Sequence, residues 1–359
     1  MRRRHFDALR PLCPVCRTQG LQTPLCIGAV ARERGAVILE GALHCTRAEC
    51  QGEFPIVDGI PILVAGLRAF ITDNIVYLTA RDDLSAHVEG MLGDGSGPGS
   101  AFNTTRQFLS SYAWDHYADL DPQEPVSEVR PGAVIRTLDQ GLALLGGVPE
   151  GPAIEIGCSV GRTSLELASR HRGLVLGVDL NVAMIRLAAR VLADGEVRYP
   201  RRQVGIVYER RTLQARFADS DRVDFWIADA LALPFADDTF ALAVALNVLD
   251  CVPAPYAFLG EIARLLAAGG GAIVATPFDW SPGSTPVEAW IGGHSQRGPN
   301  RGASEPFLRS LLDGTHAQAI PGLRLVGDQD LPWHVRLHAR STMLYRNYLA
   351  AIRAGKSGA

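Results

Sequence analysis

The chain has 359 residues, of which 47% are hydrophobic and 20% charged, and its formal net charge is -3. This length allows one large domain and a smaller one, each with its own hydrophobic core. The slight acidic excess disfavours general attraction to nucleic acid or to an anionic membrane, which usually requires a clear basic excess. No apolar run reaches the roughly 18 residues that a membrane span needs, so no membrane contact is expected.

The N-terminus and the cysteines indicate the compartment. The segment MRRRHFDALRP starts with basic residues, but no apolar stretch follows it, which argues against a secretory signal. The odd number of cysteines, 7, with close pairs among them, indicates metal binding before disulfides in an intracellular chain. We therefore expect a cytoplasmic protein.

Two close cysteine pairs lie near the N-terminus. Cys13 and Cys16 form a C-x2-C pair, and Cys45 and Cys50 form a C-x4-C pair. Each pair can form one knuckle of a tetrahedral thiolate site, and two knuckles joined by a small sheet make a zinc ribbon. The sequence therefore predicts structural zinc in a domain of residues 1–66, with free structural cysteines as the alternative.

Further residues of this region support the zinc interpretation. We expect Cys26 to be a spare buried thiol and His44 a neighbour of the site, although either could replace a ligand. The CPVC knuckle and the block CTRAECQGEFPIVDGIPILV resemble the small zinc-ribbon activator family, whose members bind and stabilise tRNA and protein methyltransferases. The resemblance implies structural zinc and a packing role without chemistry of its own.

Residues 67–150 are predicted to be a helical linker or lid. The Gly- and Ser-rich segment at residues 90–103 predicts a flexible loop. The aromatic residues of TTRQFLSSYAWDHYADL, which follows, suit a helix that forms either a lid over a pocket or plain core. Residues 134–148 predict an amphipathic helix that ends at a pair of glycines.

The segment from residue 151 predicts a βαβ unit. AIEIG is a short apolar strand, CSVGR a glycine turn, TSLELASRH a helix, and LVLGVDL a second strand ending at Asp179. Such a unit requires a parallel sheet with a right-handed crossover. Gly157 and Gly161 allow the backbone to approach a ligand at the helix N-terminus. The dinucleotide fingerprint G-x-G-x-x-G is absent, because Glu155 to Gly161 read E-x-G-x-x-x-G.

This turn resembles motif I of the Rossmann-like methyltransferases that use S-adenosylmethionine. The resemblance implies that residues 151–359 are a class I α/β domain with a parallel-dominated sheet and helices on both faces. By the same resemblance, Glu155 lies near the methionine part of the cofactor, Asp179 accepts the ribose hydroxyls, and Asp229 with Ala230 reads the adenine. The cofactor-binding set is then Glu155, Gly157, Ser159, Gly161, Asp179, Leu180, Asp229, Ala230 and Asn247.

Later segments follow in the order that this fold requires. They are the strand FWIADA, the element PFADDTF, the strand ALAVALNVL, and a helix, glycine turn and fifth strand in IARLLAAGGGAIVATPF. A long insertion precedes FWIADA. Its segment VGIVYE predicts a hairpin strand, and we expect its arginines to form a solvated face, with binding of a substrate carboxylate as the alternative.

Candidate substrate residues follow the fourth and fifth strands. Ligands of such sheets bind beyond the carboxyl ends of the strands. The fourth strand ends at ALNVLDCVP, which predicts that Asn247 and Asp250 lie near the transferable methyl group. The fifth strand ends at Thr276, so TPFDWSPGSTPVEAWIGGH, residues 276–294, is predicted to wall the substrate pocket.

A narrower resemblance covers residues 151–294. GCSVGRTSLELA, FWIADALALP and the segment from ALNVLDC to WIGG look like the C-terminal domain of ovothiol synthases, which N-methylates the imidazole of a thiolated histidine. Cys251 stands where that family tends to have Arg, and the iron-dependent sulfoxide synthase domain is missing. The resemblance implies a small-molecule substrate, and either a separate sulfoxide synthase partner or a different acceptor. A homodimer is a further expectation on partners.

Roles follow for the candidate residues. Asp250 could accept the N–H of the far imidazole nitrogen and leave the near one with a free lone pair, while Asn247 orients the amino-acid part. The substrate-binding candidates are Phe278, Trp280, Trp290 and His294. The aromatic rings would stack on a planar ring or face the sulfonium, and the alternative is a hydrophobic plug under a loop.

Two other functions stay open. One is an RNA or protein methyltransferase whose zinc ribbon grips a macromolecule, and the other is a degenerate methyltransferase that serves as a partner. The near-neutral charge and the missing N-P-P-Y tetrapeptide disfavour the first. The intact glycine motif and Asp179 disfavour the second.

Overall fold

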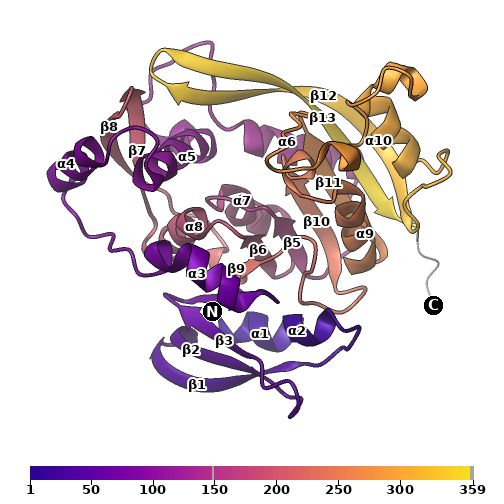
Figure 1. Ribbon diagram of the computed structural model, residues 1–359, viewed down its shortest axis with the longest axis horizontal. Helices are drawn as coiled ribbons and strands as arrows, with labels where there is room; N and C mark the ends of the chain where they lie inside the picture. Colours follow the sequence, from indigo (N-terminus) through magenta and orange to yellow (C-terminus); the bar gives the residue numbers. More distant parts are fainter. Residues whose placement is uncertain (148, 356–359) are drawn as a thin grey trace.

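The chain is built around a single large sheet (Figure 1). The structure is a computed structural model and describes residues 1–147 and 149–355. In the described residues the sheet has 11 strands in the order β1-β2-β3-β4-β9-β6-β5-β10-β11-β13-β12. Their bounds are β1 Leu25–Arg34, β2 Val37–Cys45, β3 Glu53–Val57, β4 Ile60–Leu63, β5 Ala153–Ile156, β6 Val175–Asp179, β9 Val223–Ala228, β10 Phe240–Leu246, β11 Leu266–Thr276, β12 Leu323–His338 and β13 Ser341–Ala354.

The five strands β9, β6, β5, β10 and β11 pair in parallel, and β13 is antiparallel to both β11 and β12. Parallel neighbours need crossover connections, which α7 (Arg162–Arg170), α8 (Val182–Asp194) and α9 (Pro255–Leu265) supply. Side chains of a strand alternate between two faces, and the buried residues accordingly form two clusters. The predicted parallel-dominated sheet with helices on both faces is confirmed.

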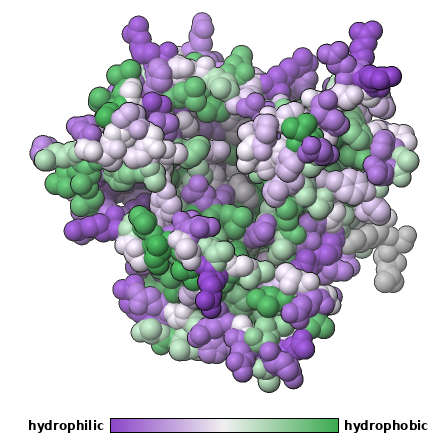
Figure 2. Space-filling view, in the orientation of Figure 1, coloured by the Kyte–Doolittle hydropathy of each residue, from purple (hydrophilic) through white to green (hydrophobic). Residues whose placement is uncertain are grey.

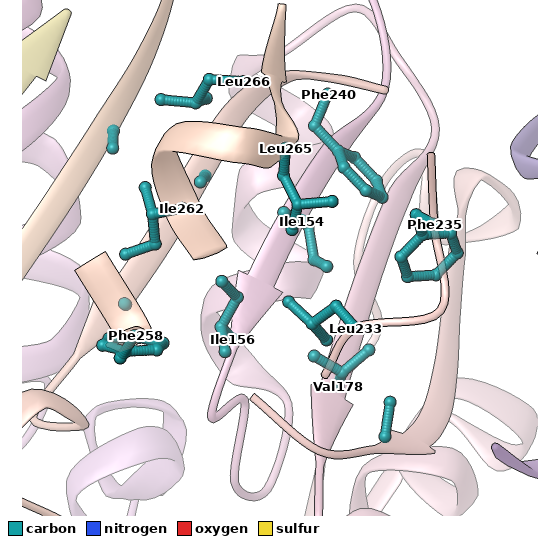
Figure 3. Close-up of a cluster of buried hydrophobic side chains, with 14 of the residues drawn as sticks. Ile154, Ile156, Val178, Leu233, Phe235, Phe240, Phe258, Ile262, Leu265 and Leu266 are labelled. Atoms are coloured by element: carbon teal, nitrogen blue, oxygen red, sulfur yellow. The ribbon is translucent and has the colours of Figure 1, made fainter. Parts of the chain in front are cut away.

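One face of the sheet carries α9 (Figure 3). There Ile154 and Ile156 of β5 and Val178 of β6 meet Phe258 and Ile262 of α9. The other face packs on α7, α8 and α6 (Ala133–Leu145), whose buried side chains join the second cluster. Because both faces are covered, the central strands are apolar throughout, as parallel strands usually are.

The predicted glycine turn before the fifth strand is wrong. Helix α9 ends at Leu265 and β11 starts at Leu266, so the glycines lie inside the strand. Their pairing with β10 shifts register between Phe240 and Leu242. A Cβ on Gly270 would lie 2.8 Å from the carbonyl oxygen of Ala267, so the close backbone approach at this irregularity requires glycine.

The N-terminal unit continues the same sheet. Strands β1 to β4 form an antiparallel meander, and β4 then pairs in parallel with β9 through Ile62 and Leu63. Short helices α1 (Arg3–Leu9) and α2 (Pro14–Arg17) lie against this unit. Phe6, Cys16 and Phe54 belong to the same buried cluster as Trp226 and Phe235. The N-terminal unit therefore shares a hydrophobic core with the parallel sheet.

The region after the meander is more ordered than the sequence suggested. It contains α3 (Leu67–Leu78), α4 (Ala86–Ser96), α5 (Ala101–Tyr117) and the short helix η1 (Ala118–Leu120). The prediction of a flexible loop over residues 90–103 is wrong, because α4 and α5 occupy most of it. The hydroxyls of Ser85 and Ser100 cap the two helices by accepting hydrogen bonds from backbone N–H groups, which stabilises them despite the glycines.

The amphipathic helix predicted over residues 134–148 is present as α6, which ends before the two glycines. Val148, the last residue of that prediction, lies outside the described residues.

The aromatic stripe of α5 is divided between core and surface. Trp114 and Tyr117 are buried, whereas Phe108 and Tyr112 are 49% and 42% exposed.

The insertion forms the predicted hairpin, β7 (Glu196–Val204) and β8 (Val207–Gln214). The prediction that its arginines form a solvated face is wrong for Arg201 and Arg211, whose side chains are 12% and 9% exposed. Each pairs with an acid of the segment after α5: Arg201 with Glu124 at 2.8 Å and Arg211 with Asp121 at 2.9 Å. These ion pairs hold the hairpin against α5.

The C-terminal part closes the far edge of the sheet. Helix α10 (Ser304–Leu312) precedes the long hairpin β12–β13, whose turn reaches β7, where the N–H of Ala339 donates to the carbonyl of Gln203 at 3.0 Å. Short 3-10 helices are η2 (Ser220–Arg222), η3 (Leu249–Cys251), η4 (Val287–Ala289) and η5 (Pro299–Gly302). Among the described helices, none has the length and apolar character needed to cross a membrane.

Candidate active site

Three strained backbone positions mark the carboxyl ends of the parallel strands. Ser159 after β5, Asn247 after β10 and Phe278 after β11 have φ angles of 51°, 59° and 55°. Such left-handed conformations are uncommon outside glycine, and for a bulky residue such as Phe they are true outliers that tend to cluster at functional sites. The surface in Figure 2 is hollowed between the side formed by α4 and α5 and the side formed by α10.

The glycine loop after β5 is built for close approach. Gly157 and Gly161 have positive φ angles of 75° and 85°. A Cβ on Gly157 would lie 2.4 Å from Val248, and one on Gly161 would lie 2.6 Å from Ala188. Gly161 is the N-cap of α7, and no side chain of the described residues caps this helix. The N-terminus of α7, with its unpaired backbone N–H groups, therefore lies at the end of the glycine loop. Glycine is therefore required at both positions.

Asp179 ties this loop to the end of the neighbouring strand β6. Its Oδ2 accepts the backbone N–H of Ser159 at 2.7 Å, and its Oδ1 accepts the N–H of Asn181 at 2.8 Å. Burial raises its pKa, and the backbone hydrogen bonds oppose that shift. Each carboxylate oxygen keeps a further lone pair, which suits a ligand with two adjacent hydroxyls. Leu180 beside it is 42% exposed and offers an apolar surface.

We expect the substitution Asp179→Asn to weaken the binding of S-adenosylhomocysteine about 10- to 100-fold, the loss typical of hydrogen bonds to a charged group. Isothermal titration calorimetry measures the dissociation constant. The control is Asp194→Asn, which removes the same charge from an exposed position at the end of α8. Equal affinity of the two variants would show that Asp179 makes no cofactor contact.

Glu155 is buried under the glycine loop, with 2% of its surface exposed. It accepts the hydroxyl hydrogen bond of Ser164 in the first turn of α7. Burial raises its pKa to about 8, and the hydrogen bonds from Ser164 and Thr163 oppose that shift. Its observed partners lie within the protein, so its contact with the cofactor amino group stays a prediction.

The raised pKa of Glu155 predicts a pH-dependent stability. Between about pH 4.5 and about pH 8 the folded state holds a proton that the unfolded chain has released, so the free energy of unfolding falls as pH rises. We expect Glu155→Gln to remove this part of the slope, worth more than about 1 kcal/mol between pH 5 and pH 8. Urea unfolding at both pH values measures it, with exposed Glu150→Gln as the control; parallel profiles for wild type and Glu155→Gln would contradict it.

The predicted adenine position follows β9. Asp229 Oδ1 accepts the N–H of Leu231 at 2.9 Å, which folds the segment into a tight turn, and both Asp229 and Ala230 are half-buried. The segment is also held by the N-terminal unit, because the N–H of Leu12 donates to the carbonyl of Pro234 at 2.8 Å. The N-terminal unit thus contacts the loop to which the sequence assigns adenine binding.

Asn247 and Asp250 lie where β10 ends, as predicted. Asn247 Oδ1 accepts a hydrogen bond from the amide of Asn347 on β13. Asp250 is 2% exposed, and its Oδ2 accepts the N–H of Asp279 at 2.7 Å. Burial raises the pKa of Asp250, the hydrogen bonds from Asp279 and Thr276 oppose that shift, and the Asp279 charge adds to it. Asp250 is thus a buried carboxylate with a raised pKa.

Three further residues that the sequence did not single out act on Asp250 or on its partner. Asp279 donates its N–H to Asp250, and the Tyr345 hydroxyl donates to Asp279 Oδ2 at 2.7 Å. Tyr112 of α5 is 42% exposed at the surface, and its partial desolvation and the charges of Cys251, Asp179 and Asp250 raise its pKa. A sequence signal existed for Asp279, which stands inside the wall segment, but Tyr112 and Tyr345 come from distant elements.

The aromatic wall segment is tied together internally. Trp280 and Trp290 stack with ring centroids 6.0 Å apart and an interplanar angle of 15°. Their indole N–H groups donate to Ser304 Oγ and to the carbonyl of Thr285. Phe278 stacks on Tyr348 with centroids 5.9 Å apart, and His294 is exposed. These contacts fit the hydrophobic plug, and direct substrate contact by the four residues stays a prediction.

Thr285 fixes this segment to the catalytic candidate. It is fully buried, and its hydroxyl lies within hydrogen-bonding distance of the carbonyls of Val252 at 2.7 Å and Asp250 at 3.2 Å. Thr285 therefore connects the wall segment to the loop after β10.

The four predicted metal ligands converge at the N-terminal unit. The sulfur atoms of Cys13, Cys16, Cys45 and Cys50 all lie within 4.8 Å of one another, and the pairs Cys13–Cys50 and Cys16–Cys45 are 3.7 and 3.6 Å apart. Tetrahedral zinc with Zn–S bonds of about 2.3 Å places its sulfurs about 3.8 Å apart, so the set fits the ion. Gly52 would carry a Cβ 3.3 Å from Cys50 Sγ, which keeps this position small.

The two neighbours of the cysteine set lie apart from it. Cys26 is exposed, so its prediction as a buried thiol is wrong: it stands on β1 at a position that faces away from the core. His44 is paired with Glu53 at 3.1 Å. The sulfur set is complete without either.

Comparisons with known proteins agree with this geometry. Residues 154–274 match the family model described as a methyltransferase domain. A chloroplastic tocopherol O-methyltransferase of Arabidopsis thaliana is 24% identical over 207 residues, 55% of this chain and 49% of that protein. Methyltransferase GfsG of Streptomyces halstedii is 28% identical over 34% of this chain and 36% of that protein. The chain thus spans about half or less of these relatives.

Solved structures with a similar fold have low identity. Magnesium protoporphyrin IX methyltransferase from Synechocystis, with bound S-adenosylhomocysteine, is 18% identical, covers 70% of this chain and 99% of its own, and has a TM-score of 0.39. A methyltransferase from Methanosarcina mazei is 20% identical, covers 57% of this chain and 92% of its own, and has a TM-score of 0.36.

Proposed function

We propose that this chain, which contains a Rossmann-like class I methyltransferase domain, transfers a methyl group from S-adenosylmethionine to a nitrogen of a small molecule. The observation that carries the proposal is the placing of two acids at one edge of the parallel sheet. Asp179, the cofactor candidate, ends β6, and Asp250, the proton-acceptor candidate, follows β10; both strands pair in parallel with β5. Ligands of such sheets bind at this edge, where a cofactor and an acceptor would share one site.

The residues present fit the cofactor. The glycine loop and Asp179 would hold the methionine and ribose parts, and the turn at Asp229 would meet the adenine. The bound cofactor supplies a methyl group on an activated sulfonium. The protein mainly has to align the acceptor and keep its nucleophile unprotonated, which a buried carboxylate such as Asp250 supports.

We propose an imidazole of a histidine derivative, of the thiohistidine kind, as the acceptor. The support is the resemblance of residues 151–294 to the ovothiol synthase domain and the ties of the wall segment to Asp250 through Thr285. A separate sulfoxide synthase would then supply the thiolated substrate, and the cytoplasm is the proposed location. The N-terminal unit has a packing role in this proposal, with zinc held by its four cysteines.

A substrate panel tests the proposal. The purified chain is incubated with labelled S-adenosylmethionine and 4-mercaptohistidine, histidylcysteine sulfoxide, histidine or bulk tRNA. We expect label in a histidine derivative. Label only in tRNA would replace the proposal by an RNA methyltransferase, and failure to bind the cofactor at all would contradict the activity itself.

A further inference from the structure

Two hydrogen bonds through Asp279, one to its side chain and one from its backbone, link the C-terminal hairpin to Asp250. The Tyr345 hydroxyl of β13 donates to Asp279 Oδ2 at 2.7 Å, and the Asp279 N–H donates to Asp250 Oδ2 at 2.7 Å. Asp250 is buried, whereas Asp279 is exposed at the start of the wall segment. The exposed carboxylate is thus held in place by Tyr345 while it remains open to a ligand.

Acidic groups dominate the electrostatics around these residues. The largest charge effects on the pKa values of Tyr112, Cys251 and Tyr345 come from groups that are negative when ionised. The carboxylates among them are Asp179, Asp250, Asp279 and Asp115. A space with this field attracts a cation and repels an anionic acceptor.

Asn347 gives an independent indication of a ligand. Its side chain is fully buried, and its amide group donates to Asn247 at the end of β10, but its own Oδ1 has no partner. It lies two residues from Tyr345 on β13, so the two side chains share a face of the strand. Buried polar atoms are nearly always paired, so a free acceptor beside Asn247 calls for a donor from outside the protein.

We propose, resting on the function above, that Asp279, Tyr345, Asp250 and Asn347 form an acceptor subsite for a protonated nitrogen base that carries N–H donors. The polar groups of the subsite are two carboxylates, an amide oxygen without a partner among the described residues and a phenol, which match an ammonium or imidazolium and disfavour a carboxylate or phosphate as the bound group.

The bound base first gives one N–H proton to the carboxylate of Asp250, and Asp250 later releases that proton to water. For an imidazole, the far nitrogen keeps its hydrogen bond to an acid of the subsite, and the near nitrogen is left with a free lone pair. The nitrogen lone pair then forms the new N–C bond while the C–S bond breaks and its electron pair returns to sulfur. Asp279 and Tyr345 act as positioning residues, because they hold the base while Asp250 takes the proton.

Binding to matched imidazoles tests the proposal. The full chain, saturated with S-adenosylhomocysteine, is titrated calorimetrically with histamine, histidine and 3-(imidazol-4-yl)propionate, which share the ring but differ in side-chain charge. We expect histamine to bind at least about tenfold more tightly than the propionate, with histidine between them. Equal or tighter binding of the propionate, or no binding of any probe by the loaded protein, would overturn the subsite. Failure to bind S-adenosylhomocysteine would instead contradict the proposed function.

Variants assign the effect to the named residues. We expect Asp279→Asn and Tyr345→Phe to weaken histamine binding about tenfold or more while S-adenosylhomocysteine binds as before, and Asp279→Glu to restore part of the loss. The matched control is Asp330→Asn on β12, a carboxylate paired with Arg346. Unchanged histamine binding in Asp279→Asn, or a parallel loss of S-adenosylhomocysteine binding, would overturn the assignment.

Discussion

The substitution Asp250→Asn is expected to slow methyl transfer about 100-fold or more, and Asp250→Ala to abolish turnover, while the affinity for S-adenosylmethionine stays nearly intact. Proton transfer to a positioned side chain typically contributes a factor of about 100 to 10,000. Asn keeps the shape of the side chain and an oxygen for the Asp279 N–H, but it cannot take a proton. Single-turnover transfer of labelled methyl and calorimetric binding measure the two quantities.

The pH profile separates catalysis by Asp250 from a structural effect. Burial raises the pKa of Asp250. The hydrogen bonds from the Asp279 N–H and from Thr276 lower it, and the charge of Asp279 raises it. The carboxylate has to be ionised to accept a proton, so the rate of the wild type should rise with pH through this raised pKa, and the Asn variant should lose that rise. Asp237→Asn, which removes an exposed acid paired with Arg264, is the control. Loss of cofactor affinity in the Asp250 variants would assign this acid to the cofactor site instead.

The sequence predicts the cofactor side of the site because its determinants are local. Gly157 and Gly161 lie in the loop after β5 and Asp179 ends β6, and in a parallel sheet all such positions meet at one edge. The same argument places Asp250 after β10, as in the structure, while its role stays a prediction. Tyr112 and Tyr345 follow no such rule, because they reach the site from α5 and from the hairpin β12–β13. Only tertiary packing brings them to Asp250.

The sequence-based predictions for the hairpin arginines and for the glycines of β11 are wrong for a related reason. Arg201 and Arg211 look like surface residues because their partners Glu124 and Asp121 lie in a segment some 80 residues earlier in the chain. The glycines of β11 look like a turn, although a register shift in the sheet requires them. In both cases the structure depends on a contact with residues that are distant in sequence. The local sequence pattern does not indicate such a contact.

The N-terminal unit is packed into the rest of the chain, so a metal held by its four cysteines would affect the stability of the whole chain. Strand β4 pairs with β9, and Cys13 and Cys16 belong to the core cluster that includes Trp226 and Phe235. Helix α2 begins after Cys13, contains Cys16 and ends at Arg17, whose guanidinium donates to Glu261 at 2.9 Å and to the carbonyl of Phe235 at 3.3 Å. Loss of structure around the cysteines would therefore also disrupt the packing of the hydrophobic core of the methyltransferase domain.

Removal of the metal is accordingly expected to destabilise the whole chain by several kcal/mol and to lower its melting temperature by about 10 °C or more, because binding of structural zinc contributes directly to folding. The measurement is thermal unfolding with and without a strong chelator, together with metal analysis of the purified protein. Cys16→Ser should reproduce the loss in melting temperature and in zinc content. Cys26→Ser, which changes an exposed thiol of the same unit, should leave both unchanged. If neither the chelator nor Cys16→Ser changes the melting temperature, the shared hydrophobic core stabilises the N-terminal unit without any ion.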